Sequence, residues 1–407
     1  MDRIETRLEF TTRPGLWLWI ALGIGAVVRI FLIFATEGTH DVTIWQTHAG
    51  WTHQYGLAEY YGRSEVFNHP PFIAKLLSLV WEWAKAVDVP FRIPHRAIFT
   101  VFDIGNTWLL YRLFADSRWR FLVAATYWSN PLAILLASYH GNTDTAVAFA
   151  MLLAVRAAAR GRVVAAGAAI GFGLWIKLPV ILAVPALVFA LGDLRKRVVF
   201  GASALVVASV TYLPTAIEAP ALLFDRVIAY PGLTLRTAGG DPVWGIWFVL
   251  PAAARNALAG LISAHQTYNT WVVLAPVVLL AWLRRHACDA RGLGRTLGLS
   301  LMIFYGFTLN WAYQYLAWSI PFWWFVGPGF VVAATVVLAG FVYPLYAFLC
   351  DGWLLTGPWA YWRDPSWPAP IEWMRNLALL FCAGTGVAGL VLAFRDRSKA
   401  DAAVGRP

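Results

Sequence analysis

The chain has 407 residues, of which 59% carry apolar side chains and only 13% are charged, and its formal net charge is +10. Soluble globular domains usually carry about 25% charged residues, so this composition excludes an ordinary water-soluble enzyme and a disordered protein. The three cysteines, Cys288, Cys350 and Cys382, lie far apart and form neither a metal-binding pattern nor a disulfide framework. The composition predicts a polytopic membrane protein.

The first predicted span follows a basic N-terminal segment. Residues 16–35 form an apolar run long enough to cross a bilayer as a helix, and no small-residue cleavage site follows it. We therefore expect an uncleaved first helix. Further apolar segments, several too short for a full crossing unless tilted or broken, lie at 100–113, 121–138, 145–155, 164–176, 178–191, 198–212, 272–283, 297–308, 315–326, 330–349 and 377–394.

Clusters of basic residues predict the orientation, because cytoplasmic loops of membrane proteins carry an excess of lysine and arginine. The clusters lie at 112–120, 156–162, 195–197, 284–295 and 395–399. Placing them inside puts 36–96 outside and makes 72–87 an amphipathic helix on the outer surface. We expect an all-α, GT-C-type bundle of about 11–13 transmembrane helices, with an outer first loop that carries amphipathic helices. The predicted partition is one membrane-embedded domain, with a core at about 1–215 and variable helices and outer loops at about 216–407.

Polar residues near the predicted outer face need an explanation, because a charge at membrane depth costs at least about 2.5–3.5 kcal/mol. Simple structural roles are available: Arg29 and Lys177 can snorkel, and Asp144 can cap a helix. Acids, histidines and cations nevertheless gather on one predicted face, as proton transfer beside a phosphate requires. The segments concerned are Arg29, His40-Asp41, Asn68-His69-Pro70-Pro71-Phe72, Tyr139-His140-Gly141-Asn142-Thr143-Asp144 and Lys177-Leu178-Pro179.

These segments resemble the GT-C superfamily, the multi-span glycosyltransferases that use polyprenyl-phosphate sugars. Arg29 with its following aliphatic residues and Asp41 resemble the end of the first helix and the acidic outer loop. The segment at 68–72 is similar to the Tyr-Pro-Pro segment of dolichyl-phosphate-glucose glucosyltransferases, and 139–144 to their Gly-His-Phe-Gln motif. Residues 139–144 also resemble the second acidic motif of the oligosaccharyltransferase catalytic subunit. Residues 171–179 fit the lysine-bearing turn, and 310–318 resemble the late Gln-Tyr-x-x-Trp segment.

Two departures from the family bear on metal use. The GPI mannosyltransferases have Asp-x-Asp in the first loop, whereas this chain reads Asp41-Val42-Thr43, and Asp144 has no second acid two positions away. With one first-loop carboxylate, we expect a metal-independent enzyme with no cofactor.

The resemblance implies a donor class and roles for individual residues. We expect an inverting transfer of a hexose, with mannose favoured, from a polyprenyl-phosphate sugar to a hydroxyl of a glycolipid or glycan. The enzyme is expected in the cell (inner) membrane, with its active site on the periplasmic or extracellular face, and no nucleic-acid partner is expected. Asp41 is the predicted catalytic base. The donor phosphate is assigned to Lys177, Arg236, Arg226 and His140, and substrate binding to His40, His69, Asp144, Trp45, Gln314 and Tyr315.

The main alternative is a flippase or transporter of a lipid-linked glycan. Such a protein needs polar or acidic residues along a path through its spans. Asp103, on a predicted helix with Asn106, is the main acid found there, and a helix–helix hydrogen bond explains it. A non-catalytic membrane scaffold, a third alternative, gives no reason for the clustered acids and cations. The sequence therefore favours an enzyme.

Overall fold

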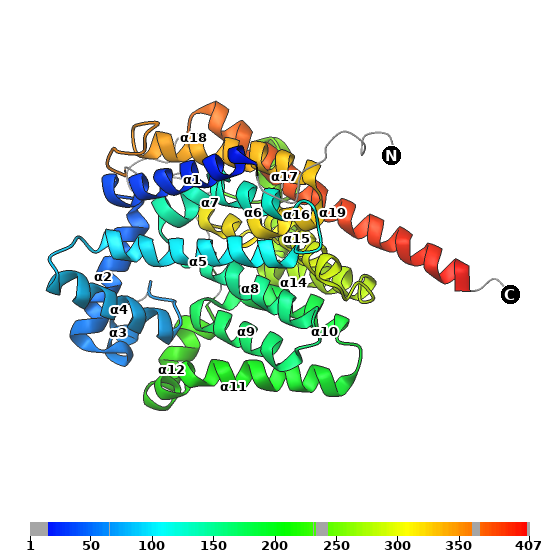
Figure 1. Ribbon diagram of the computed structural model, residues 1–407, viewed down its shortest axis with the longest axis horizontal. Coiled ribbons are helices and arrows are strands. Elements are labelled where there is room, and N and C mark those ends of the chain that lie inside the picture. The colour runs from blue at the N-terminus through cyan, green and yellow to red at the C-terminus, as the bar shows by residue number, and fades with distance from the viewer. Residues whose placement is uncertain (1–14, 65, 231, 233–242, 360–366, 405–407) are drawn as a thin grey trace.

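The computed structural model of the protein describes residues 15–64, 66–230, 232, 243–359 and 367–404. Helices are the only regular elements assigned in these ranges, apart from one isolated bridge at Trp311, which agrees with the predicted all-α polytopic membrane protein (Figure 1). The N-terminal half comprises α1 (Leu16–Ala35), α2 (His40–Tyr55), α3 (Leu57–Arg63), α4 (Pro71–Ala86), α5 (Arg92–Leu113), α6 (Arg120–Trp128), α7 (Pro131–Ile134), η2 (Leu135–His140), α8 (Asp144–Ala158), α9 (Val163–Ile176), η3 (Leu178–Ala183), α10 (Val184–Ala190) and α11 (Leu194–Glu218).

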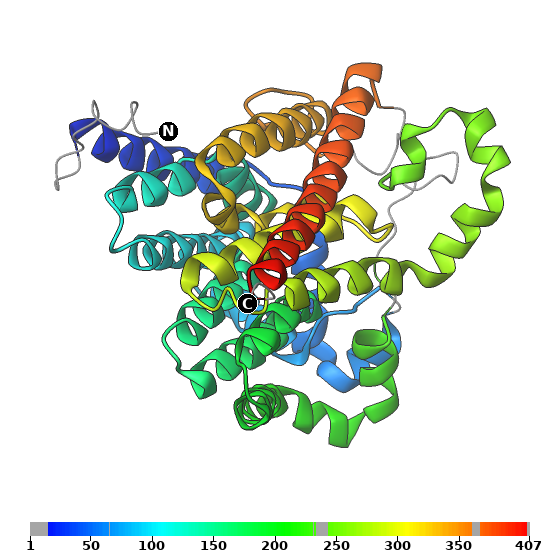
Figure 2. The same ribbon diagram turned by 90° about the vertical axis from the view of Figure 1, so that its right-hand side faces the viewer.

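The C-terminal half is more interrupted. It comprises α12 (Pro220–Leu223), η4 (Phe224–Ile228), η5 (Ile246–Val249), α13 (Ala252–Ala257), α14 (Ala259–Leu283), α15 (Ala290–Phe307), η6 (Tyr313–Trp318), η7 (Ile320–Phe322), α16 (Trp323–Val326), α17 (Pro328–Ala334), η8 (Thr335–Ala339), α18 (Gly340–Leu349) and α19 (Ala369–Val404). Figure 2 shows α13 and the first half of α14 standing off from the main bundle, where Leu261 and Trp271 are exposed.

Five helices of the described residues are long and apolar enough to cross a membrane: Leu16–Ala35, Leu194–Glu218, Ala259–Leu283, Pro328–Leu349 and Ala369–Ser398. A sixth span results if Arg120–Trp128 and Pro131–His140, which meet at an angle of 48°, cross together. Every other predicted span also falls on helical segments, but these are short or carry charges. The expected total of 11–13 therefore remains a prediction.

Helices α2, α3 and α4 gather at one end of the bundle (Figure 1). The predicted surface helix at 72–87 is α4, and Pro71 begins it, a position where the missing N–H of proline has no cost. Ile73, Leu77 and Val80 lie on its buried face, whereas Trp83 is exposed. The expected amphipathic helix in the first loop is thus present and packs on α2.

Arg29 does not join the polar residues near α2, contrary to expectation. Its Nε donates to Asp103 Oδ2 at 3.2 Å and its Nη1 to the Trp128 carbonyl at 2.6 Å, and the Tyr127 hydroxyl donates to the same carboxylate. Both charged side chains are almost fully buried. A buried ion pair with complete hydrogen bonding can be retained inside a bundle, so Arg29 and Asp103 link α1, α5 and α6.

Arg96 of α5 binds the carboxyl end of α1. Its guanidinium donates to the carbonyls of Leu32, Ile33 and Thr36 at 3.0, 2.6 and 2.6 Å. The last carbonyls of a helix lack partners within the helix, so a basic side chain there satisfies them. Arg96 thereby holds the turn between α1 and α2, which leads directly to the first turn of α2.

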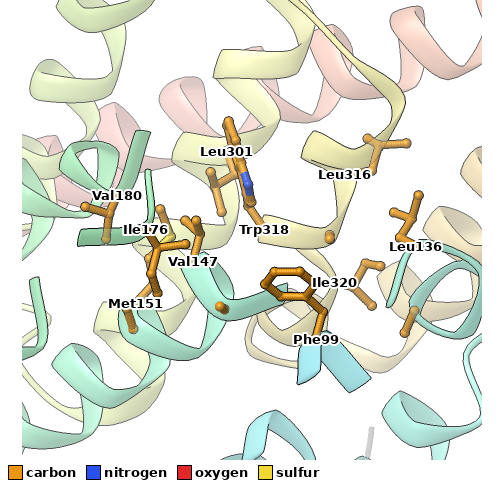
Figure 3. Close-up of a cluster of buried hydrophobic side chains, with 14 of the residues drawn as sticks. Phe99, Leu136, Val147, Met151, Ile176, Val180, Leu301, Leu316, Trp318 and Ile320 are labelled. Atoms are coloured by element: carbon orange, nitrogen blue, oxygen red, sulfur yellow. The ribbon is translucent and has the colours of Figure 1, made fainter. Parts of the chain in front are cut away.

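The hydrophobic core adjoins the polar cluster described below, because Trp318 takes part in both. Figure 3 shows Phe99, Val147, Ile176 and Leu301 around Trp318, contributed by α5, α8, α9, α15 and η6. These side chains are 1% exposed or less. Close packing of this kind leaves few alternative positions for the backbone of η6.

Candidate active site

Several of the described segments that carry predicted site residues depart from α-helical geometry. His140 ends the π-helical turn η2, Lys177 lies between α9 and the 3₁₀ turn η3, and Gln314 lies in the 3₁₀ turn η6. Such irregular turns often mark functional positions in helical proteins. At membrane depth they are tolerated only where the backbone is buried in protein or lines a cavity.

Asp41 lies in the first turn of α2 and is bound by three donors from distant segments. Its Oδ2 accepts from His140 Nε2 at 2.9 Å, Asn142 Nδ2 at 3.0 Å and Gln314 Nε2 at 3.4 Å. No described residue donates to Oδ1, and the side chain is 34% exposed. One oxygen of this carboxylate is therefore open to a ligand.

His140 connects Asp41 to the bundle interior. Its other nitrogen, Nδ1, lies 2.6 Å from the Tyr346 hydroxyl, and its side chain is 3% exposed. The ring satisfies both contacts, since Nε2–H donates to the carboxylate and Nδ1 shares a hydrogen bond with the hydroxyl. The imidazole then holds Asp41 in one orientation.

The residue after His140 must be glycine. Gly141 has φ +63°, which favours glycine, and a Cβ there would collide with Arg96 Cγ. Its carbonyl also bonds His95 Nε2 at 2.6 Å. The turn that aims His140 is thus held by His95 and by Arg96, and Arg96 also holds the end of α1.

The charges around Asp41 keep it ionised. Burial raises the pKa of Asp41, but the His140 ring and the Lys177 ammonium outweigh this effect and lower it to about 2. At neutral pH the group is a carboxylate, and a weaker base than an ordinary one. It gains a proton only from a hydroxyl whose oxygen is already forming a new bond and has become acidic.

Lys177 forms the second part of the cluster. Its Nζ lies 3.0 and 3.2 Å from the two oxygens of Asp144, which also accepts from Trp318 Nε1 at 2.6 Å. The ammonium lies 4.7 Å from the centre of the Tyr315 ring, within cation–π range. Asp144 is the first residue of α8, where the helix dipole favours a negative charge. It does not cap the helix.

The two parts share their backbone segments. Gln314 contacts Asp41 and the next residue, Tyr315, contacts Lys177. Asn142 contacts Asp41, and Asp144, two residues later, binds Lys177. We call these two parts together the polar cluster.

His69 lies near the polar cluster, where the charges of Lys177 and Asp41 act on it, and Trp45 packs against it. Their ring centres are 4.2 Å apart, and Trp45 is 2% exposed, so it is packed among rings and its predicted contact with substrate is untested. Burial lowers the pKa of His48 to about 4 and holds that of His69 well below its ordinary value, which keeps both rings neutral. His40 is the first residue of α2, next to Asp41.

The remaining predicted cations are Arg226 and Arg236. Arg226 is partly buried in η4. Arg236 lies outside the described residues. Within the described ranges, no three His, Cys, Asp or Glu side chains are grouped as a metal site.

Several residues of the polar cluster were not assigned from the sequence. Asn142 and Trp318 lie inside the segments 139–144 and 310–318, which contain predicted site residues. Both side chains can form hydrogen bonds, so their position in the sequence could have identified them. Tyr346 and Arg96 have no such signal, because one lies in an apolar helix and the other resembles an interfacial arginine.

The chain matches the family model of the GPI transamidase subunit PIG-U over residues 45–224. The matched stretch is less than half of the chain and includes His69, His140, Asp144 and Lys177, whereas Asp41 and Gln314 lie outside it. No curated protein matches the chain.

Proposed function

We propose that this membrane protein is an inverting, metal-independent glycosyltransferase. It moves a hexose, with mannose favoured, from a polyprenyl-phosphate sugar to a hydroxyl of a glycolipid or glycan on the outer face of the membrane. The observation that carries the proposal is the polar cluster: a carboxylate with one open oxygen lies beside an ammonium that a second carboxylate holds in place.

Asp41 is the proposed base. The acceptor oxygen forms a bond to the anomeric carbon from the side opposite the phosphate, and the bond from that carbon to the phosphate oxygen breaks. The acceptor proton passes to Asp41 Oδ1, while the donors on Oδ2 hold the carboxylate in position. General base catalysis of this kind typically contributes 10²–10⁴-fold to the rate.

Lys177 is the proposed phosphate ligand. An ammonium has three N–H donors, of which the Asp144 oxygens take two, leaving one for a phosphate oxygen. The lipid phosphate carries one negative charge before the carbon–oxygen bond breaks and two afterwards. Asp144 already neutralises the positive charge of Lys177. The second negative charge of the departing phosphate therefore requires further cations, and Arg226 and Arg236 are the proposed ones.

The test uses the purified full-length protein and a panel of radiolabelled polyprenyl-phosphate sugars with glycolipid acceptors. Wild-type protein is expected to transfer one of the hexoses. Asp41→Asn keeps the side-chain shape but cannot take the proton, so we expect at least a 100-fold loss of turnover with donor binding retained. Near-normal turnover in Asp41→Asn contradicts the assigned base, and no transfer from any donor contradicts the enzyme.

The match to PIG-U supports a second candidate, a membrane subunit that binds a lipid-linked glycan without transferring it. In that case the polar cluster recognises the sugar phosphate only. Donor binding by wild-type protein, with no transfer to any acceptor and equal binding by Asp41→Asn, is the outcome that favours this candidate.

A further inference from the structure

An open groove of about 680 Å³ lies between α2 and α4, apart from the polar cluster. Thr43, Gln46, Thr47 and Gln54 line it from α2, and Trp81 lines it from α4. Spacings of three, four and seven residues place side chains on one face of a helix. This face differs from the one that carries Asp41, yet Thr43 and Asp41 share the first turn of α2.

The lining favours a neutral, hydroxyl-rich ligand. Among the described residues that line the groove, none is Asp, Glu, Lys or Arg. Hydroxyl and amide groups both donate and accept hydrogen bonds, as sugar hydroxyls do, and the indole rings of Trp51 and Trp81 offer amphipathic faces. A phosphate group would need fixed cations.

A second cavity, of about 480 Å³, shows the contrast. It lies among α1, α5 and α6 and is lined almost entirely by apolar side chains, including Leu18, Ile104 and Phe121. An acyl chain fits such an apolar lining, whereas it does not fit the polar lining of the groove between α2 and α4.

One side of the groove is lined by the ring of Trp81, and its base is lined by the small residue Gly50. Trp81 contacts the Lys85 ammonium, 4.7 Å from its ring centre, and the His53 ring, whose centre is 5.1 Å away. Gly50 lies on the floor, and a Cβ there would make only ordinary contact, at 3.5 Å from Trp81. Packing therefore does not require glycine at position 50, but a large side chain there would fill the groove.

We propose that this groove binds the oligosaccharide part of the acceptor, a proposal that rests on the proposed glycosyl transfer. From Thr43 to Gln54 the face extends about 16 Å at the helical rise of 1.5 Å per residue. A neutral glycan lying along it begins at the turn that carries Asp41 and continues along α2.

The experiment measures binding of soluble neutral trisaccharides, mannotriose and maltotriose among them, to the full-length protein in nanodiscs by saturation-transfer NMR. Trp51→Ala and Gly50→Leu are expected to weaken binding at least tenfold. Trp83→Ala is the matched control, since Trp83 is an exposed tryptophan of α4 that does not line the groove, and it is expected to bind normally. Thermal unfolding of each variant reports whether it is folded.

Asp41→Asn separates this proposal from the proposed function, because it should keep trisaccharide binding and lose transfer. Wild-type binding that the groove variants abolish, without transfer from any donor, retains the groove and overturns the enzyme. If no trisaccharide binds the wild type, or if Trp51→Ala and Trp83→Ala bind equally, the groove proposal is wrong.

Discussion

At the scale of single residues, the two acids of the polar cluster differ in exposure and in hydrogen-bond partners. Asp41 has one oxygen with no donor among the described residues and is one-third exposed, whereas Asp144 is almost fully buried and binds both Lys177 and Trp318. A carboxylate with a free lone pair can take a proton, and one that is fully paired positions its partner. The two acids are therefore suited to different tasks.

The pH dependence of transfer tests the coupling of Asp41 to His140. Because the folded-state pKa of Asp41 is lowered to about 2, it stays ionised above about pH 3, and the wild-type rate should show no acid limb near pH 4. His140→Gln removes the largest influence that lowers this pKa, while Lys177 and Asn142 still lower it, so the acid limb should move to a higher pH than in the wild type. The measurement is the rate at saturating donor, with circular dichroism at each pH to follow folding. An unchanged profile in His140→Gln contradicts the coupling.

At the scale of elements, the cluster depends on interruptions in helices. The π-helical turn η2 and the turns at Lys177 and η6 bring His140, Lys177 and Gln314 to the amino end of α2. Regular helices would carry these side chains along separate axes. Arg96 stabilises this arrangement, since it bonds the last carbonyls of α1 and lies against Gly141.

Gly141→Ala tests the role of η2. A non-glycine residue in the left-handed region costs about 1–2 kcal/mol, and the added Cβ also meets Arg96, which is anchored to α1. We expect a loss of turnover of at least tenfold together with a lower thermal midpoint. Gly161→Ala is the control, because it has φ +70° with no atom near the added Cβ and so carries the strain alone. Equal turnover in the two variants argues against a positioning role for the turn.

At the scale of the whole molecule, the basic clusters and the first-loop helices lie at opposite ends. The turns from α5 to α6, from α8 to α9, from α10 to α11 and from α14 to α15 lie at the end opposite α2, α3 and α4, as does the end of α19 (Figure 1). By the excess of basic residues in cytoplasmic loops, α2 and α4 should face outward.

Cysteine labelling in intact cells tests this orientation. Thr47 on α2 and Arg195 at the start of α11 are both exposed, and Cys288 is the exposed native cysteine of the described residues. In a Cys288→Ser background, a membrane-impermeant maleimide should label Thr47→Cys from outside and Arg195→Cys only after permeabilisation. Labelling of both from the same side contradicts the predicted topology.

Removal of divalent metals tests the proposed metal-independent mechanism. That mechanism uses one first-loop carboxylate, Asp41, and assigns to Lys177 the positive charge that a metal would otherwise supply. Transfer in excess EDTA should stay within about twofold of the untreated rate. A complete loss that Mg²⁺ or Mn²⁺ restores would reverse the prediction.

Properties that depend on local composition could be predicted without the tertiary structure. The lengths of apolar runs indicated a helical membrane protein, and the charged residues in 72–87, with the orientation set by the basic clusters, indicated the surface helix α4. Asp41, His140 and Lys177 were identified because polar residues are costly next to apolar spans and therefore conspicuous, whereas Gln314 was identified from the resemblance of 310–318 to the GT-C superfamily.

Long-range pairing was decided only by the tertiary structure. Arg29 looked like a site residue but is neutralised by Asp103, 74 positions away, and Tyr346 completes the contacts of His140 across 206 positions. The groove between α2 and α4 likewise depends on how two helices pack. Patterns of hydropathy and charge can be read from residues that are neighbours in the sequence. The partner of a buried polar atom, in contrast, depends on which helices pack together.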